Sequence, residues 1–335
     1  MKHLIAFFFL LFSVGSFPVF GQVEEPPEEI LKIETRLVSV PVLVSDREGR
    51  FISGLKEGDF SVFQDGVRQE IAFFADETEP INVALLLDTS YSTTEVIDRI
   101  KSAAFDFVRL LKKDDRAMVL SFDTDIKILT PLTSDRNRLN NGINTARAEN
   151  VSGTVMRKTV NDVINPLFAD VKGRKAIILL TDGKDFGSQI SEENLLYNLE
   201  ESDVLVYSVF YLTELNKFLQ TDPAVVNSRI DKNNPGAGVR RSEQNLRRME
   251  LIKKNNLEAT AYLNRMSDLT AGRFYERDVT DLKETFKLIV DELRKQYRIG
   301  FYPPDESEKG KVHQIRVRVK RENLAVRARK TYRSK

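Results

Sequence analysis

The chain has 335 residues, 41% of them hydrophobic, which is enough for one large domain and a smaller one. Its 51 basic and 50 acidic residues leave a formal net charge of +1, so bulk charge does not favour binding to nucleic acid or membrane surfaces. Because there is no cysteine and there are only two histidines, disulfides and thiolate metal sites are excluded, and a zinc site or a Ser-His-Asp triad is not expected.

The first residues have the pattern of a secretory signal peptide, which we predict at residues 1–21. Lys2 supplies the positive charge, residues 4–17 form a short apolar run, and cleavage is expected before Gln22. That run is too short for a membrane-spanning helix and no later segment is apolar enough, so we expect a periplasmic or secreted protein with no transmembrane segment after signal removal. Residues 22–36, rich in Pro and Glu, are predicted to be a flexible leader.

Two flanking segments show the alternation of short β-strands. Residues 37–76 include a hairpin signal at Asp65 and Gly66, which predicts a small antiparallel β module. In residues 297–335, apolar and basic residues alternate over 315–320, as on a half-buried strand. No aromatics interleave with this basic stripe, so we interpret it as a solvated strand face and expect no nucleic-acid partner. We predict that the two segments pair into one β module.

The region between the flanks, residues 80–296, alternates apolar strands with amphipathic helices. This pattern predicts a doubly wound, mostly parallel α/β sheet covered on both faces. Residues 213–256 are polar and broken by Pro and Gly, and they are predicted to form a surface excursion with a helix near 243–252. The strands are predicted at 82–88, 117–122, 175–181, 204–212 and 272–276. The helices are predicted behind the first strand and near 135–146, 156–168, 191–199, 257–269 and 282–293.

Oxygen-bearing side chains follow two of the predicted strands. The first apolar strand ends in Asp88, followed by Ser90 and Ser92, and a later strand ends just before Asp182. Thr154 lies on a glycine-containing loop that precedes a helix. Ligands bind outside the carboxyl ends of strands in open parallel sheets, and an all-oxygen set is what hard divalent cations such as Mg²⁺ prefer. With few charged ligands, such a cation stays electrophilic and takes an anionic ligand from outside.

This set resembles the metal-ion-dependent adhesion site of the von Willebrand factor type A domain, whose motif is Asp-x-Ser-x-Ser, a distant Thr and a distant Asp. The resemblance covers residues 82–293, and the flanks resemble those of bacterial exported proteins that carry this domain. One departure is Ser152, where relatives commonly have a second glycine before the threonine.

The resemblance implies a non-enzymatic protein of the adhesion type. It implies that Ser90, Ser92 and Thr154 bind the cation directly, and that Asp88 and Asp182 bind it directly or through water. The implied cofactor is Mg²⁺, with Mn²⁺ or Ca²⁺ as alternatives. The implied partner is a protein that presents an acidic side chain to complete the coordination.

Three other readings of the site stay open from sequence. A magnesium-dependent phosphotransferase of the haloacid dehalogenase type would use Asp88 as nucleophile, although Ser90 occupies the position of its acid-base aspartate. A Ser-Lys hydrolase using Lys184 has no oxyanion-hole motif to support it, and the phosphate-binding G-x-x-x-x-G-K-[ST] loop is absent. A scaffold with a vestigial site is the third alternative. Two interpretations of Asp123 and Asp125 also stay open: one of them is a further metal ligand, or the pair forms a turn after the strand.

Overall fold

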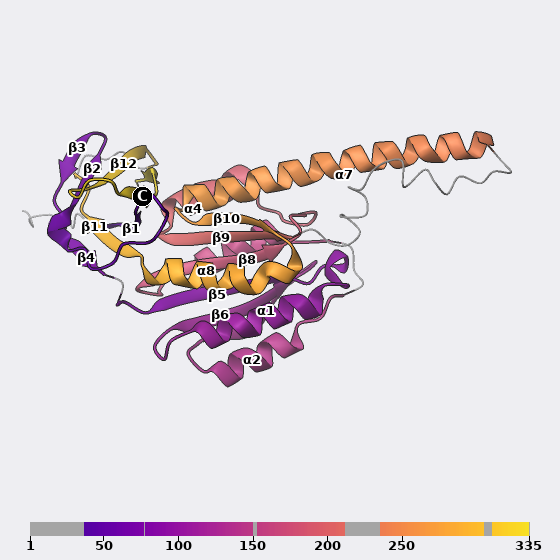
Figure 1. Cartoon of the computed structure of the whole chain (residues 1–335), viewed down its shortest axis with the longest axis horizontal. Coiled ribbons are helices and arrows are strands. Elements are labelled where there is room, and N and C mark those ends of the chain that lie inside the picture. The colour runs from indigo at the N-terminus through magenta and orange to yellow at the C-terminus, as the bar shows by residue number, and fades with distance from the viewer. Residues whose placement is uncertain (1–36, 77, 150–152, 212–234, 305–309, 335) are drawn as a thin grey trace, which may run out of the picture. The chain divides into compact units, whose positions relative to one another are not determined.

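A computed structural model of the chain describes residues 37–76, 78–149, 153–211, 235–304 and 310–334 (Figure 1). These residues belong to one compact unit, Thr35–Lys335. The predicted signal peptide and leader lie outside the described residues, so both stay predictions. The predicted boundaries between the β module and the α/β region, at residues 76–80 and 296–297, also stay predictions.

The centre of the unit is a six-stranded sheet. Its strands are β5 (Ile81–Asp88), β6 (Arg116–Phe122), β7 (Ile126–Thr133), β8 (Arg174–Thr181), β9 (Val204–Tyr211) and β10 (Arg273–Arg277). They are ordered β10-β9-β8-β5-β6-β7, and every neighbouring pair is parallel except β6 and β7. All residues of β5 and β9 are buried, which explains why these strands are continuous apolar runs in the sequence.

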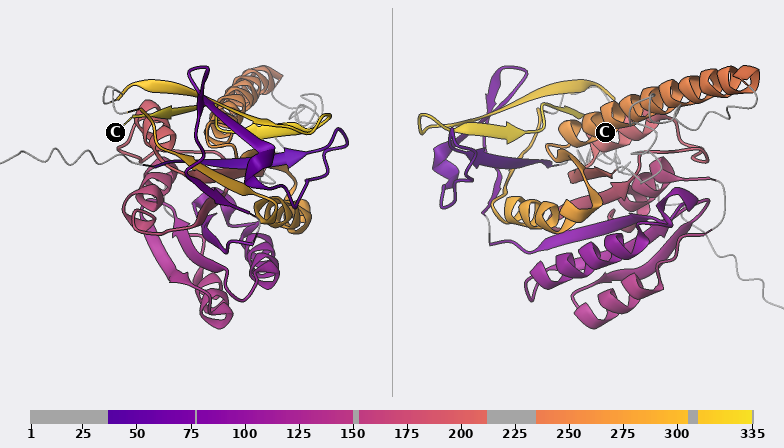
Figure 2. Two further views of the ribbon diagram at one scale, coloured as in Figure 1. Left: turned by 90° about the vertical axis from the view of Figure 1, so that its left-hand side faces the viewer. Right: turned by 45° about the vertical axis from the view of Figure 1, so that its right-hand side comes forward.

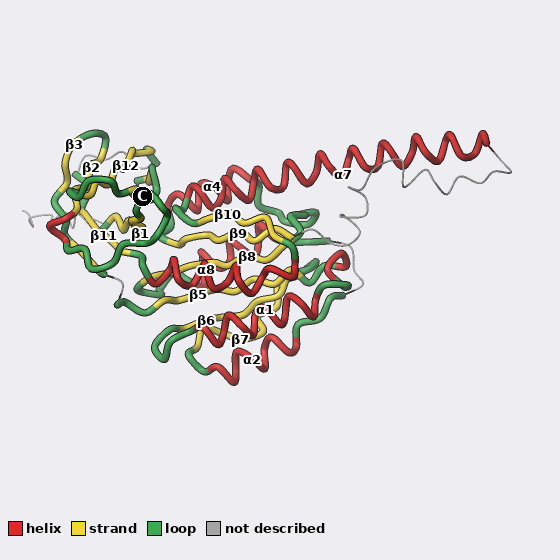
Figure 3. The backbone as a smooth tube through the Cα atoms, in the orientation of Figure 1, coloured by secondary structure: helices red, strands yellow, loops and turns green. Residues whose placement is uncertain are grey.

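Helices cover both faces of this sheet, as the red and yellow segments of Figure 3 show. On one face, buried apolar side chains of α1 (Ile97–Leu110), α2 (Arg136–Thr145) and α8 (Leu282–Arg294) form one core cluster with the sheet. On the other face, α3 (Met156–Asp162), α4 (Glu192–Glu201) and the carboxyl-terminal part of α7 (Pro235–Leu269) form a second cluster. The predicted doubly wound fold is confirmed.

The flanking segments pair with each other, which confirms that they form one β module. The amino-terminal flank supplies β1 (Val38–Ser45), β2 (Phe60–Gln64), β3 (Val67–Gln69) and β4 (Phe73–Ala75). The carboxyl-terminal flank supplies β11 (Tyr297–Phe301), β12 (Val312–Val319), β13 (Ala325–Ala328) and β14 (Thr331–Arg333). Strand β1 pairs antiparallel with β11 and β13, and β2 pairs antiparallel with β12. Strands from the two ends of the chain, indigo and yellow in Figure 2, therefore lie together.

A buried ion network links the β module to the central sheet. Glu292 of α8 is 1% exposed, and its Oε1 accepts a hydrogen bond of 2.8 Å from the Tyr207 hydroxyl of β9. The same oxygen pairs with the Arg327 guanidinium of β13, and Oε2 lies 3.2 Å from Arg273 Nε of β10. One carboxylate of α8 therefore contacts side chains of β9, β10 and β13.

Two predicted helices have different limits in the structure. The segment predicted at 156–168 is α-helical only to Asp162 and continues as a wider turn over Val163–Leu167, because Pro166 has no N–H and Asn165 has non-helical dihedral angles. The helices predicted near 243–252 and 257–269 are one helix, α7, since nothing between them breaks it. Residues 212–234, in the predicted excursion, lie outside the described residues.

Strand β7 was not predicted. Its residues are mostly half-buried and carry threonines and Pro131, so they lack the continuous apolar character of the parallel strands. It lies at the edge of the sheet, where such a composition is tolerated.

Candidate metal centre

The first part of the site is the loop that follows β5. Asp88 is fully buried at the end of the strand, and its Oδ1 accepts hydrogen bonds from the backbone N–H and the hydroxyl of Ser90, at 3.0 and 2.5 Å. The Ser90 and Ser92 hydroxyl oxygens lie 3.2 Å apart. Ser90 contacts the carboxylate and precedes a short 3-10 turn, Tyr91–Thr93, which contains Ser92. The structure thus brings together the first three predicted ligands.

The second part follows β8, the parallel neighbour of β5. The hydroxyl of Thr181 donates to the other oxygen of Asp88 at 2.7 Å, which fixes that carboxylate between the two strand ends. Asp182 is 1% exposed, and its Oδ2 lies 2.5 Å from the ammonium of Lys184. Its Oδ1 is buried and, among the residues that the structure describes, has no hydrogen-bond partner. An unpaired buried carboxylate oxygen is costly and indicates a site for a cation or water.

The two carboxylates influence each other electrostatically. Burial, followed by the negative charge of Asp182, raises the pKa of Asp88 to about 7. Burial also raises the pKa of Tyr211, and the charges of both aspartates add to this shift. Two like charges in a buried site are unfavourable unless a cation lies between them, and a divalent cation fits this requirement.

The loop before α3 carries Thr154, which is buried. Its carbonyl oxygen accepts hydrogen bonds from the N–H groups of Phe186 and Gly187, at 3.1 and 3.2 Å. These bonds hold the Thr154 backbone against the loop that follows Asp182. Gly153 has φ +144°, and a Cβ there would lie 2.7 Å from Thr124 Cγ2, so this position requires glycine. Ser152, the departure from the family pattern, lies outside the described residues.

Asp123 is a further candidate ligand from sequence, but in the structure its carboxylate contacts Asp125, Lys127 and Thr89. Its Oδ1 accepts from the Asp125 N–H at 3.1 Å, as in a turn, and its Oδ2 lies 3.3 Å from Lys127 Nζ. The Thr89 hydroxyl lies 3.5 Å from the same Oδ2. Asp123 therefore supports the loop after β5 from the neighbouring strand.

The composition of the site agrees with a cation held largely by hydroxyls. In the described part of the chain, no three His, Cys, Asp or Glu side chains are grouped so that they could hold a metal ion. A site here must therefore rest on two carboxylates and on Ser and Thr oxygens, a set that suits hard cations. The sequence did not assign Thr181 to the site, and it offered Lys184 only as the lysine of a Ser-Lys hydrolase, not as the partner of Asp182. The signal for Thr181 was its place as the last residue of an apolar strand.

The doubly wound sheet and its polar strand ends define an α/β domain with a candidate cation site at the carboxyl edge. Residues 83–184, which include all five predicted ligands, match the family model of the von Willebrand factor type A domain. The comparison with curated proteins found no match.

The chain is similar to several solved structures. A von Willebrand factor type A protein from Catenulispora acidiphila is 13% identical, with 82% of this chain and 73% of that chain covered and a TM-score of 0.47. BatB from Bacteroides thetaiotaomicron is 15% identical, with coverages of 64% and 98% and a TM-score of 0.43. Proximal thread matrix protein 1 from the mussel byssus, solved with a zinc-occupied MIDAS motif, is 14% identical, with coverages of 68% and 48% and a TM-score of 0.47. The chain thus spans about half the length of the mussel protein.

Proposed function

We propose that the strand-end site holds a divalent cation and uses it to bind an acidic side chain of a partner protein, without catalysis. Ser90, Ser92 and Thr154 are the direct ligands, and Asp88 and Asp182 act directly or through water. The cation is Mg²⁺, with Mn²⁺ or Ca²⁺ as alternatives. The observation that carries the proposal is the buried Oδ1 of Asp182, which has no partner within the described part of the chain, together with a second buried carboxylate whose pKa is raised.

The hydrogen bonds of Asp88 favour binding over catalysis. Its two oxygens accept from the N–H and hydroxyl of Ser90 and from the hydroxyl of Thr181. A carboxylate that accepts three hydrogen bonds is a weak nucleophile, because most of its roughly four lone-pair sites are already engaged. Ser90, which stands where the phosphotransferase needs an acid-base aspartate, does not protonate a leaving group well at neutral pH.

Lys184 has a defined role in this proposal. Its ammonium balances the charge of Asp182 when no cation is bound, at 2.5 Å from Oδ2. A bound divalent cation repels that ammonium, so metal binding releases Lys184 toward solvent, where 35% of its side chain is already exposed.

Export is part of the proposal and rests on the signal-like residues 1–21. Among the residues that the structure describes, no helix has the length and apolar character needed to cross a membrane. We propose that the protein acts outside the cytoplasm, in the periplasm or beyond it.

Titration calorimetry of the purified protein with MgCl₂, MnCl₂ and CaCl₂ tests the metal site. We expect one cation per chain, loss of binding in Asp88→Ala, and weaker binding in Ser92→Ala, a smaller change that keeps the loop. The control is Asp98→Ala, an exposed aspartate in the helix that follows the loop, and it binds as the wild type does. Equal binding by wild type and Asp88→Ala excludes the site.

A turnover assay separates binding from catalysis. The same preparations are incubated with p-nitrophenyl phosphate and each cation, and the release of nitrophenol is followed. We expect no release above the protein-free rate. Release that requires the metal and Asp88 establishes the phosphotransferase reading and rejects the binding proposal.

A further inference from the structure

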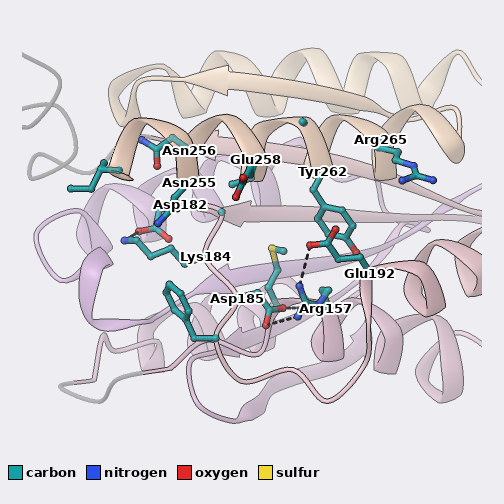
Figure 4. A pocket seen from close by; sticks show the side chains of 16 residues that line it. Arg157, Asp182, Lys184, Asp185, Glu192, Asn255, Asn256, Glu258, Tyr262 and Arg265 are labelled. Carbon is teal, nitrogen blue, oxygen red and sulfur yellow. Dashed lines mark hydrogen bonds and ion pairs between the residues drawn. The ribbon is translucent and has the colours of Figure 1, made fainter. Parts of the chain in front are cut away.

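A cavity of about 630 Å³ lies between α7 and the loop that follows β8 (Figure 4). Asp182, Gly183 and Lys184 form part of its wall, so it opens beside the candidate metal centre. Its volume falls within the range of roughly 300–1,000 Å³ that is usual for ligand pockets.

Helix α7 forms the opposite wall and touches the metal loop directly. Gly183 has φ +83°, and a Cβ there would lie 2.7 Å from the Cβ of Ala259 and 3.0 Å from the ring of Phe210. Any side chain at residue 183 would therefore push α7 away. The glycine brings the helix into contact with the loop that carries Asp182.

Apolar side chains form part of the cavity wall, between charged and amide side chains. Met156, Ile252 and Tyr262 line it, and the ring of Phe186 stands at its side with 73% exposure. The Tyr262 hydroxyl and Asn256 Nδ2 are buried, and no described residue forms a hydrogen bond with either atom. An apolar or aromatic side chain of a ligand can pack against these apolar side chains, and against the rings of Phe186 and Tyr262 in particular.

The charges inside the cavity are largely paired. Arg157 lies 3.6 Å from Asp185 and 3.5 Å from Glu192, and Lys184 pairs with Asp182. The cavity itself therefore presents little net charge toward the ligand. Exposed aromatic rings stand in both metal loops, since Tyr91 between the two serines is 62% exposed.

The helix above the cavity is strongly cationic. Residues 235–256 contain six basic and two acidic residues, a net charge of +4 in a chain whose total is +1. Lys253 and Lys254 are exposed one turn before Asn256. A helix of 35 residues is about 52 Å long, twice the roughly 26 Å of an eight-residue strand. Its amino-terminal half therefore extends past the strand ends, as Figure 1 shows.

We infer that this cavity receives an aromatic or large aliphatic side chain from the same partner segment whose carboxylate caps the cation. The segment is acidic, because the cationic half of α7 attracts it, and its apolar side chain lies within one or two residues of the capping carboxylate. This inference rests on the proposed function, since the cation supplies the first contact. It adds the chemistry by which the partner is selected: an acidic residue next to an apolar one, in an acidic stretch.

Selection from a displayed library of random dodecapeptides, on the immobilised protein in excess MgCl₂, tests the inference. We expect enriched peptides in which Asp or Glu lies within two positions of Phe, Trp, Tyr, Leu or Ile, in an acidic context. Acidic enrichment with no apolar neighbour rejects the cavity as a subsite and leaves the metal proposal in place. Enrichment without acidic residues, or no enrichment, rejects both.

Variants of the cavity give a second readout with the best selected peptide. Phe186→Ala removes an exposed ring at the cavity, and Asn255→Trp fills the cavity from an exposed position of α7. We expect each variant to weaken peptide binding about tenfold and to retain Mg²⁺ binding. The matched control, Tyr302→Ala, removes an exposed aromatic ring after β11 and leaves peptide affinity unchanged. Equal affinities for wild type and both cavity variants overturn the inference.

Charge variants of α7 test the guiding role of the helix. Lys253→Glu combined with Lys254→Glu is expected to slow peptide association about tenfold at low salt, with the difference shrinking as NaCl is added. Association rates that do not change in the double variant overturn the electrostatic part of the inference.

Discussion

Replacing Glu292 with glutamine tests the buried ion network that joins α8 to β13. The carboxylate is 1% exposed and pairs with Arg273 and Arg327, whose side chains are 46% and 30% exposed. Removing one partner of a buried pair costs about 3–5 kcal/mol, because the other charges lose their compensation. Since both arginines reach solvent in part, we expect the lower end of that range, about 3 kcal/mol.

The expected loss converts into a measurable shift of the unfolding temperature. An entropy of unfolding of roughly 2.1 cal/mol/K per residue gives about 0.6 kcal/mol/K for a unit of some 300 residues. A loss of about 3 kcal/mol therefore lowers the midpoint by about 5 °C, which calorimetry or circular dichroism resolves. Glutamine keeps the volume of the side chain, so the loss comes from charge and hydrogen bonding and creates no cavity.

The matched control is Asp291→Asn, which makes the same chemical change at the preceding, exposed residue of α8. We expect its stability to stay within about 0.5 kcal/mol of the wild type. Equal midpoints for Glu292→Gln and Asp291→Asn would show that the network adds nothing to stability. A double variant with Arg327→Met is expected to lose less than the sum of the single losses, because both changes remove the same interaction.

Three further predictions concern separate parts of the chain. Gly183→Ala introduces a Cβ at a residue with φ +83°, 2.7 Å from the Cβ of Ala259. We expect it to lower the free energy of unfolding by about 2 kcal/mol or more and to weaken Mg²⁺ binding in calorimetry. Wild-type stability and Mg²⁺ affinity in this variant would contradict the close contact of α7 with the loop. The hydrogen bond with His313 is the main cause that lowers the pKa of Asp65 below its usual value of 3.8. Because the folded pKa is lowered, Asp65 stabilises the fold above pH 4, and this stabilisation is lost as the pH falls through the folded pKa. Asp65→Asn, which tolerates the left-handed turn at φ 49°, should lose less stability than the wild type between pH 5 and 2 in acid unfolding; an unchanged acid profile contradicts this. Amino-terminal sequencing of exported protein should begin at Gln22, and an uncleaved amino terminus contradicts the signal prediction.

Local sequence patterns determined most of the architecture. The continuous apolar runs that become β5, β8 and β9, and the helical spacing behind them, predict a parallel sheet with two covered faces. The spacing of Asp88, Ser90 and Ser92 indicated the site, because residues this close in sequence share one loop whatever the rest of the chain does. The alternation in β12 predicted a strand that is buried on one face.

Only the tertiary structure decided the contacts that join distant segments. The hydrogen bond from Thr181 to Asp88, the pairing of Lys184 with Asp182, and the buried Glu292 network each depend on how two or more strands and helices pack. Helix α7 became a wall of the cavity because Gly183 lets it approach. The periodicity of apolar residues predicts which face of a helix or strand is buried, but it does not predict which neighbouring element packs against that face. The chemistry of the site was therefore readable from the chain, whereas its surroundings came from packing.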